Sequence, residues 1–396
     1  MFRRMLVKAA AAGLCATLVA SAVAQENRVS ASKKGSLLVY SNVEVKYDDQ
    51  GNVIQDTFIE LTNDTNVQVR VQLYFINGDA ATAEEPGWNN VDNEILLTPD
   101  EPSYWAASTG QPKGVSPWNV LDPGDPAGRP DPDDANLRTI RGYILAWAVN
   151  ADAEQIRHNH LTGDAIVINY AAGTAFEYKA YAFQALDPYA DGDVVGVAGN
   201  ILLNGVNYDY GFDQLLLDFY ATGSMALSGG GQAVGIDTDL TLYPVTVDLR
   251  QDNNGPILTK AEFAVWNMNE TRFSGMTRCI ECWDQSLVSN YAAPNHMLLQ
   301  FLQTDKGKAR IDGVRSTVCD RPDRLSSAAS LLGSYARLLS FEGGLAQAAT
   351  GDVMVGQGTQ AAQIQYDPVN PGGELNPSRG LEMGGFGLGS FKADTP

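Results

Sequence analysis

Apolar and polar side chains alternate along several short stretches of the chain. In residues 67–75 every second residue is Val, Leu or Phe, and Gln, Arg or Tyr stand between them. Successive side chains of a β-strand point to opposite sides, whereas a helix would spread the same residues around its circumference. The pattern therefore predicts a strand with one buried side and one solvent-facing side, as is typical of antiparallel sheets.

The same alternation, or a run of apolar residues, predicts further strands. They cover residues 37–47, 57–62, 143–149, 165–170, 176–183, 240–249 and 353–366. Turn-forming residues separate them, since the chain has 39 glycines and 18 prolines. Two other stretches, 202–220 and 326–339, fit a strand or a short helix equally well.

Many short strands joined by turns predict an all-β protein. We expect two antiparallel β-sandwich domains in tandem, immunoglobulin-like or jelly-roll-like, because 396 residues provide material for two cores. The flexible segment SGGGQ indicates a linker between them. The expected division is a first domain at 34–227, a linker at 228–234, a second domain at 235–366 and a Gly/Pro-rich tail at 367–396.

The hairpin pattern that opens the first domain recurs after the linker, with the same spacing from glycine to asparagine. The matched positions are Tyr40, Gly51 and Asn63 in the first copy and Tyr243, Gly255 and Asn267 in the second. A duplicated sandwich would explain the match, and so would two unrelated hairpins, which share much of this pattern.

Residues 1–24 have the form of a signal peptide, with Arg3, Arg4 and Lys8 before an apolar run and a small-residue cleavage site. Residues 25–33 follow as a loose arm. The apolar run is too short to span a bilayer, and no later segment approaches the required length. The mature protein is therefore expected to be secreted, either periplasmic or extracellular.

The chain is strongly acidic, and removing the leader makes it more so. The formal net charge is −20, and loss of the three leader cations changes it to −23. A surface of that charge repels nucleic-acid phosphate and anionic lipid, so neither is expected as a partner. The oligomeric state is not set by any of these features.

Three cysteines lie outside the leader, at Cys279, Cys282 and Cys319. Thiols tend to pair in an oxidising compartment, so we expect one disulfide from the Cys279/Cys282 pair to Cys319. It would close a loop of about 40 residues and contribute about 3–4 kcal/mol. The alternatives are a redox pair resolved by Cys319, and a metal site that adds His296.

His158 and His160 are two residues apart and would share a face of a strand, so with His296 they form a second candidate metal site. Their position in a polar connection between strands favours a surface loop instead.

Asp187, Asp191 and Asp193 have the oxygen spacing of the first half of a calcium loop, with Gly192 at the turn. The distal glutamate of such a loop is missing. A structural calcium ion is the candidate cofactor, and no other cofactor is expected.

The sequence has no GxSxG elbow, no phosphate-binding glycine pattern and no HExxH motif. The leading hypothesis is an exported non-catalytic structural or binding protein of the cell envelope or extracellular space. One alternative is a secreted hydrolase of polysaccharide or protein that uses carboxylates or a metal. It would require two acidic side chains, or the three histidines, in one cleft. The other alternative is an envelope thiol-redox protein.

Three segments resemble an uncharacterised family of exported bacterial β-rich proteins. They are WNMNETRFSGMTRCIECWDQSL at 266–287, TDKGKARIDG at 304–313 and DTFIELTND at 56–64. The likeness covers most of the mature chain. That family has no assigned activity, so the resemblance implies a bacterial origin and a cysteine region that belongs to the fold. It implies no substrate, cofactor or site residue.

Overall fold

The computed structural model describes residues 33–78, 90–114, 116, 129–131, 134–226, 233–250, 258–315, 329–341 and 347–369. The signal peptide, nearly all of the loose arm, most of the linker, Cys319 and most of the tail lie outside these ranges. Within them the chain is mostly β, with a four-residue helix α1 (Leu299–Leu302) and a 3₁₀ turn at Val288–Asn290. No helix of the described residues has the length and hydrophobicity to cross a membrane.

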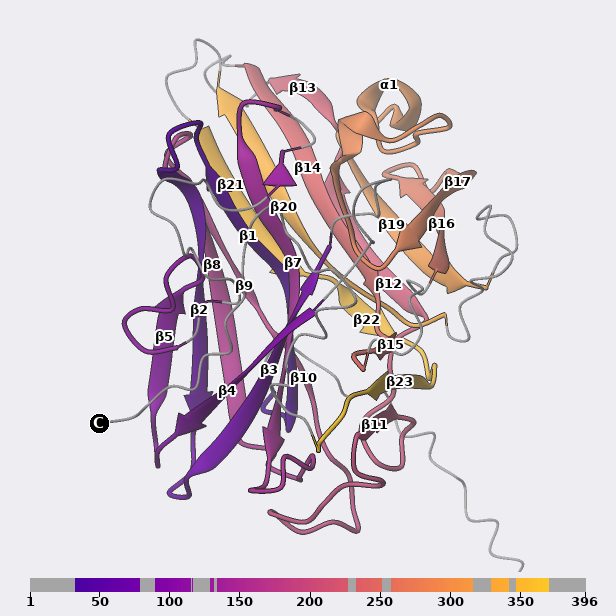
Figure 1. Ribbon diagram of the computed structural model, residues 1–396. Coiled ribbons are helices and arrows are strands. Elements are labelled where there is room, and N and C mark those ends of the chain that lie inside the picture. Colours follow the sequence, from indigo (N-terminus) through magenta and orange to yellow (C-terminus); the bar gives the residue numbers. More distant parts are fainter. Residues whose placement is uncertain are drawn as a thin grey trace, which may run out of the picture.

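The first half of the chain forms one large antiparallel sheet, drawn in indigo to magenta in Figure 1. Its strand order is β4-β3-β7-β1-β2-β8-β9, and β10, β5 and β6 pair with β1, β2 and β7. The strands are β1 (Leu37–Tyr47), β2 (Val53–Asn63), β3 (Val69–Asn77), β4 (Asn90–Leu97), β5 (Pro102–Ala106), β6 (Arg129–Pro130), β7 (Arg138–Val149), β8 (Leu161–Asn169), β9 (Thr174–Lys179) and β10 (Tyr181–Phe183).

Three further sheets contain the remaining strands. The middle sheet has the order β13-β14-β20-β21 with β18 on β14, and the outer sheet has the order β17-β16-β19-β12-β22. The small sheet has the order β11-β23-β15, in which β15 runs parallel to β23. The strands are β11 (Asn200–Leu203), β12 (Gln214–Tyr220), β13 (Gly223–Ala226), β14 (Ala233–Pro244), β15 (Val247–Asp248), β16 (Leu258–Asn267), β17 (Arg272–Glu281), β18 (Asp284–Leu287), β19 (Lys306–Val314), β20 (Leu331–Phe341), β21 (Gln347–Val353), β22 (Val355–Gln357) and β23 (Ala362–Gln365).

The buried members of one apolar cluster come mainly from the large sheet. Its buried members lie between Leu38 and Ala182, and they include the alternate residues Val69, Val71 and Leu73 of β3. Because strands of a single sheet supply nearly all of these side chains, the sheet must curve so that its own strands face one another. The alternation in residues 67–75 therefore predicted the correct inward side, apart from Val67, which is 58% exposed.

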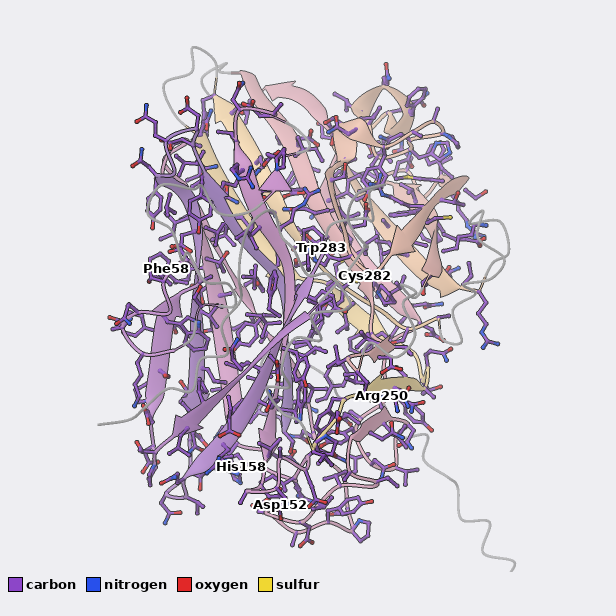
Figure 2. The ribbon with its side chains drawn as sticks, viewed as in Figure 1. Phe58, Asp152, His158, Arg250, Cys282 and Trp283 are labelled. Carbon is purple, nitrogen blue, oxygen red and sulfur yellow. The ribbon has the colours of Figure 1, made fainter. Side chains whose placement is uncertain are left out.

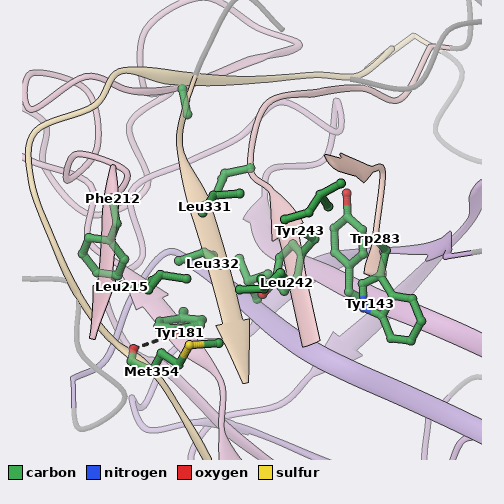
Figure 3. Packing of buried hydrophobic residues seen from close by; sticks show 14 of the residues in the cluster. Tyr143, Tyr181, Phe212, Leu215, Leu242, Tyr243, Trp283, Leu331, Leu332 and Met354 are labelled. Atoms are coloured by element: carbon green, nitrogen blue, oxygen red, sulfur yellow. Dashed lines mark hydrogen bonds between the residues drawn. The ribbon is translucent and has the colours of Figure 1, made fainter. Parts of the chain in front are cut away.

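A second and larger apolar cluster lies between the opposite side of the large sheet and the other three sheets. Figure 3 shows part of it, including the hydrogen bond that Tyr181 of β10 donates to the carbonyl oxygen of Met354 (2.7 Å). The carbonyl oxygen of Gly333 lies 2.6 Å from the same hydroxyl group. The rings of Tyr143 and Tyr243 stack with centroids 4.6 Å apart. These contacts fix the middle sheet against the large one.

The predicted solvent-facing side of residues 67–75 is partly wrong. Gln72 and Tyr74 are 1% and 4% exposed, and the Tyr74 ring stacks on Trp147 with centroids 5.1 Å apart. Alternation distinguishes the two sides of a strand, but it does not show that a second layer covers the more polar side.

The sheets combine strands from both sides of the predicted linker. β12 pairs with β19 and β22, β11 pairs with β23, and β13 pairs with β14 across the linker itself. The larger cluster likewise runs from Leu37 to Tyr366. The all-β prediction is confirmed, whereas the division into two sandwich domains stays a prediction.

The two hairpins behind the duplication hypothesis have different partners. β1 pairs with β2, but the described ladders of β14 join β13, β18 and β20, while β16 pairs with β17 and β19 in another sheet. Similar alternation in both segments reflects burial of one side in each strand, and it does not specify a strand's neighbour.

Candidate functional site

The solvent-facing side of the outer sheet carries an open groove. In β19 the side chains of Lys306, Lys308 and Arg310 point outward, while Gly307 and Ala309 are buried, as the period of two in a strand requires. On the neighbouring strand β12, the residues Leu216 and Asp218 likewise alternate with buried leucines. The groove has a volume of about 680 Å³. Its lining includes Leu216, Asp218, Trp266, Met268, Lys308 and Arg310.

Trp266 stands at the centre of this groove between two guanidinium groups. Its direct cross-strand neighbours are Arg272 on β17 and Lys308 on β19. The Cζ atoms of Arg272 and Arg310 lie 5.5 Å and 5.9 Å from the indole centroid. A cation at this distance over an indole is attracted by the negative face of the ring, so strand register holds the tryptophan in place.

The cations around Trp266 differ in their partners. Arg310 is neutralised by Asp312, with Nε and the carboxylate oxygen 2.9 Å apart. Among the described residues, Arg272, Lys306 and Lys308 form no ion pair with a carboxylate. The acids Asp218 and Glu270 also border the groove, and Met268 is 67% exposed beside it. The groove thus presents two lysines without an ion-pair partner in the described part of the chain, Lys306 and Lys308, next to aromatic and thioether surface, and Arg272 lies beside it on the Trp266 ring.

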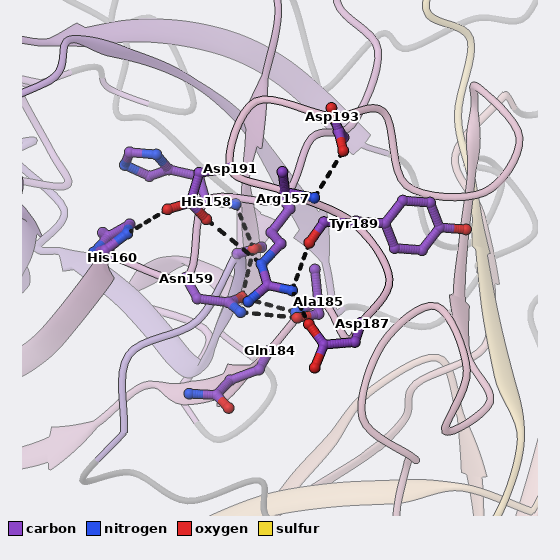
Figure 4. A network of polar contacts seen from close by, with 12 residues as sticks. Arg157, His158, Asn159, His160, Gln184, Ala185, Asp187, Tyr189, Asp191 and Asp193 are labelled. Carbon is purple, nitrogen blue, oxygen red and sulfur yellow. Dashed lines mark hydrogen bonds and ion pairs between the residues drawn. The ribbon is translucent and has the colours of Figure 1, made fainter.

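The histidines do not meet at one point. His158 is buried with Nε2 3.0 Å from the Asn63 side-chain oxygen, and His160 lies beside it with Nε2 3.1 Å from Asp191 (Figure 4). Burial, and then the neighbouring His160, lower the pKa of His158 to about 4. His296 instead contacts the backbone oxygen of Ser274 in the outer sheet. The three-histidine cleft required by a metal-dependent hydrolase is therefore not formed.

The three aspartates of the candidate calcium loop have protein partners. Arg157 donates to Asp187 at 2.9 Å, and its Nε lies 3.5 Å from Asp191 (Figure 4). Asp193 accepts a hydrogen bond from the backbone of Ala190. No group of three or more His, Cys, Asp or Glu side chains in the described parts of the chain is arranged to hold a metal ion. The calcium site stays a prediction.

The two described cysteines are in different environments. Cys282 is a buried thiol outside any disulfide, and its Sγ lies 3.9 Å from the Asn77 carbonyl oxygen, near the middle of the molecule in Figure 2. Cys279 is exposed on β17 and is not a free thiol. Strand β18, not a helix, follows the pair, so the helix N-terminus that activates a thioredoxin-type cysteine is missing here. The predicted partner, Cys319, lies outside the described residues.

A second cavity, of about 220 Å³, lies between the large and middle sheets. We call it the inter-sheet pocket. Its charged lining residues are Glu44, Lys46, Arg141 and Asp239. Burial, and then the charge of Glu44, raise the pKa of Asp239 to about 7. Sequence alternation placed Glu44 and Lys46 on the polar side of β1, but nothing in the sequence indicated that β14 and β18 would cover that side.

Comparison with known proteins gives no family. No family model matches the chain, and no curated protein matches it either. Among solved structures, the crystal structure of the CupB6 tip adhesin from Pseudomonas aeruginosa aligns with 81% of this chain and 91% of that chain, at 9% identity. The TM-score is 0.10, which is too low to support any argument about fold or function.

Proposed function

We propose that the protein is an exported, non-catalytic binding protein of the cell envelope or extracellular space, and that the outer-sheet groove binds an acidic saccharide. The observation that supports this most is that Lys306 and Lys308 line the groove without an ion-pair partner among the described residues, on a chain of net charge −20. Arg272 and Lys308 are the cross-strand neighbours of Trp266. Unpaired cations gathered in a hollow of an otherwise acidic protein favour an anionic ligand.

The remaining groove residues suit a sugar better than a simple anion. The partly buried Trp266 and the exposed Met268 offer apolar surface to the C–H side of a sugar ring. The amides of Asn267 and Gln357 can exchange hydrogen bonds with hydroxyl groups. A volume of about 680 Å³ lies within the range of small-molecule sites and accommodates a short oligosaccharide.

The overall charge limits which acidic saccharides fit. Asp218 and Glu270 border the same groove, and the rest of the chain is strongly acidic. A densely sulfated polymer would meet repulsion beyond the groove, whereas a chain with one carboxylate per ring meets the cations at intervals. We therefore favour uronic-acid oligosaccharides.

The hydrolase alternative has one supporting feature, since Glu44 and Asp239 share the inter-sheet pocket. However, Glu44 is already held by Lys46 at 3.2 Å and by the Gln55 amide at 2.6 Å. A carboxylate so fully engaged is poorly suited to act as nucleophile or base, so binding is the better-supported function.

The test compares the affinity for trigalacturonate with that for the matching neutral galactotriose by isothermal titration calorimetry. We expect trigalacturonate alone to bind, and the variants Lys308→Gln and Arg272→Gln each to weaken it roughly 10-fold through loss of a charge-assisted contact. Lys179→Gln, on β9 of the large sheet, is the matched control and should leave the affinity unchanged. Equal affinity for both trisaccharides, or no binding of either, would refute the proposal.

A further inference from the structure

The inter-sheet pocket is separate from the groove, and both charged and apolar side chains line it. Glu44 and Lys46 come from β1, Arg141 from β7, and Asp239 from β14. Its apolar wall consists of Val167, Phe176, Leu287 and Leu338. Asp239, Gln285 and Ser286 are only half-buried, so the cavity is open to solvent on the side of β14 and β18.

Most charges around the pocket are paired with one another. The ammonium group of Lys46 lies 3.2 Å from a Glu44 oxygen and 3.0 Å from an Asp131 oxygen. Gln55 donates to the second Glu44 oxygen at 2.6 Å. Lys46 is therefore the ion-pair partner of two carboxylates.

The carboxylate of Asp239 has fewer stabilising partners than that of Glu44. The Gln285 amide donates to it at 2.7 Å, and no Lys or Arg of the described residues forms an ion pair with it. The Cζ atom of Arg141 lies 5.8 Å from the Trp283 ring centroid. Among the described residues, the ion pairs of the cluster join Lys46 to Glu44 and to Asp131, and not to Asp239.

The absence of an ion-pair partner for Asp239 among the described residues agrees with its raised pKa. Burial and the Glu44 charge raise its pKa to about 7, and Gln285, Lys46 and Arg141 oppose the rise only in part. At neutral pH the carboxyl therefore holds a proton about half of the time. A cation that entered the pocket would stabilise the ionised form and release that proton.

We propose that the inter-sheet pocket binds a small organic monocation of the alkylammonium class, with Asp239 as its counter-ion and Phe176 as an aromatic wall. Phe176 and Asp239 line the same pocket, and an aromatic ring and a carboxylate in one pocket suit such a cation. A metal ion fits less well, because the walls include Val167, Leu287 and Leu338 and the described residues contain no group of three or more metal-ligating side chains.

The experiment uses the full mature chain with choline as the probe, and 3,3-dimethylbutan-1-ol as its neutral isostere. Calorimetry at pH 7 in buffers of different ionisation enthalpy measures both affinity and proton release. We expect choline to bind with release of about half a proton, and the neutral isostere not to bind. This readout uses the unaltered protein and does not depend on how well a variant folds.

Two variants and a control locate the site. Asp239→Asn should weaken choline binding roughly 10-fold or more, and Phe176→Leu should weaken it several-fold. Glu177→Gln, next to Phe176 on the exposed side of β9, should bind choline like the parent. The proposal is overturned if choline does not bind, if the neutral isostere binds equally, if Asp239→Asn retains full affinity, or if potassium competes with choline at equal concentration.

Discussion

The surroundings of individual charged residues in this protein depend on which sheets cover them. Glu44 and Lys46 alternate with the apolar residues of β1 and would face water in an isolated hairpin. In the folded chain the middle sheet covers them, and they form an ion pair beside Asp239. The sequence contained the residues of this cluster but not the layer that brings them together, because β1 and β14 are nearly 200 residues apart.

The raised pKa of Asp239 has a consequence for stability. A carboxyl whose folded pKa is raised to about 7 binds a proton more tightly in the folded state than in the unfolded state. Its stabilising contribution is complete below the ordinary pKa of 3.8 and is lost as the pH rises through about 7.

We therefore predict that the unfolding free energy of the parent protein falls by about 1–3 kcal/mol between pH 5 and pH 8 because of Asp239. The Asp239→Asn variant should lack this fall. The measurement is urea unfolding of both proteins at the two pH values. A parent and variant with the same change in unfolding free energy between pH 5 and pH 8 would contradict it.

At the scale of single elements, alternation predicted strands well and their partners poorly. Strand β1 has the predicted bounds, and residues 331–339 of the ambiguous stretch at 326–339 lie in β20. β14 pairs with β20 along its full length, although nearly 90 residues separate the two strands. Alternation specifies which side of a strand is buried, whereas the partner depends on contacts distant in sequence.

The groove could have been recognised in part. Lys306, Lys308 and Arg310 recur at a period of two on an acidic chain, which indicates a cationic strand face. Their position beside Trp266 follows from the pairing of β16 with β19. That pairing was not predicted, because the hairpin pattern of Tyr243, Gly255 and Asn267 implied that the segment ending at Asn267 returns against 240–249.

The close packing of the middle sheet on β10 gives a second prediction. A Cβ atom at Gly333 would lie 2.4 Å from both the Met354 methyl carbon and the Thr241 carbonyl oxygen. Gly333→Ala should therefore destabilise the fold by about 1–3 kcal/mol through overpacking.

Gly235→Ala in β14 is the matched control, because its new Cβ would meet Ser340 at an ordinary 3.7 Å. Urea unfolding of the two variants is the check. Equal stability of the two variants would show that the strands do not pack as closely as described.

The cysteine pair of β17 yields a third prediction. Since Cys282 is a buried thiol outside any disulfide and Cys279 is disulfide-bonded, we predict that the disulfide joins Cys279 to Cys319. Mass spectrometry of peptides from the non-reduced mature protein should find that cross-link and one alkylatable thiol at Cys282. A Cys282–Cys319 cross-link, or three alkylated thiols, would contradict the assignment.

At the scale of the whole molecule, four sheets interlock around a shared apolar cluster, and the outer sheet leaves one face open (Figure 1). Composition predicted an acidic β-rich protein, and the fold concentrates unpaired cations on that open face. The ligand-binding site is therefore expected on that face, on strands β12, β16 and β19.

The most direct test of the groove is hydrogen–deuterium exchange of the mature chain with and without trigalacturonate. The account predicts that the ligand slows exchange in residues 266–270 and 306–310, which border the groove, and leaves the large sheet unchanged. Slower exchange confined to the large sheet, or no change at saturating ligand, would contradict it.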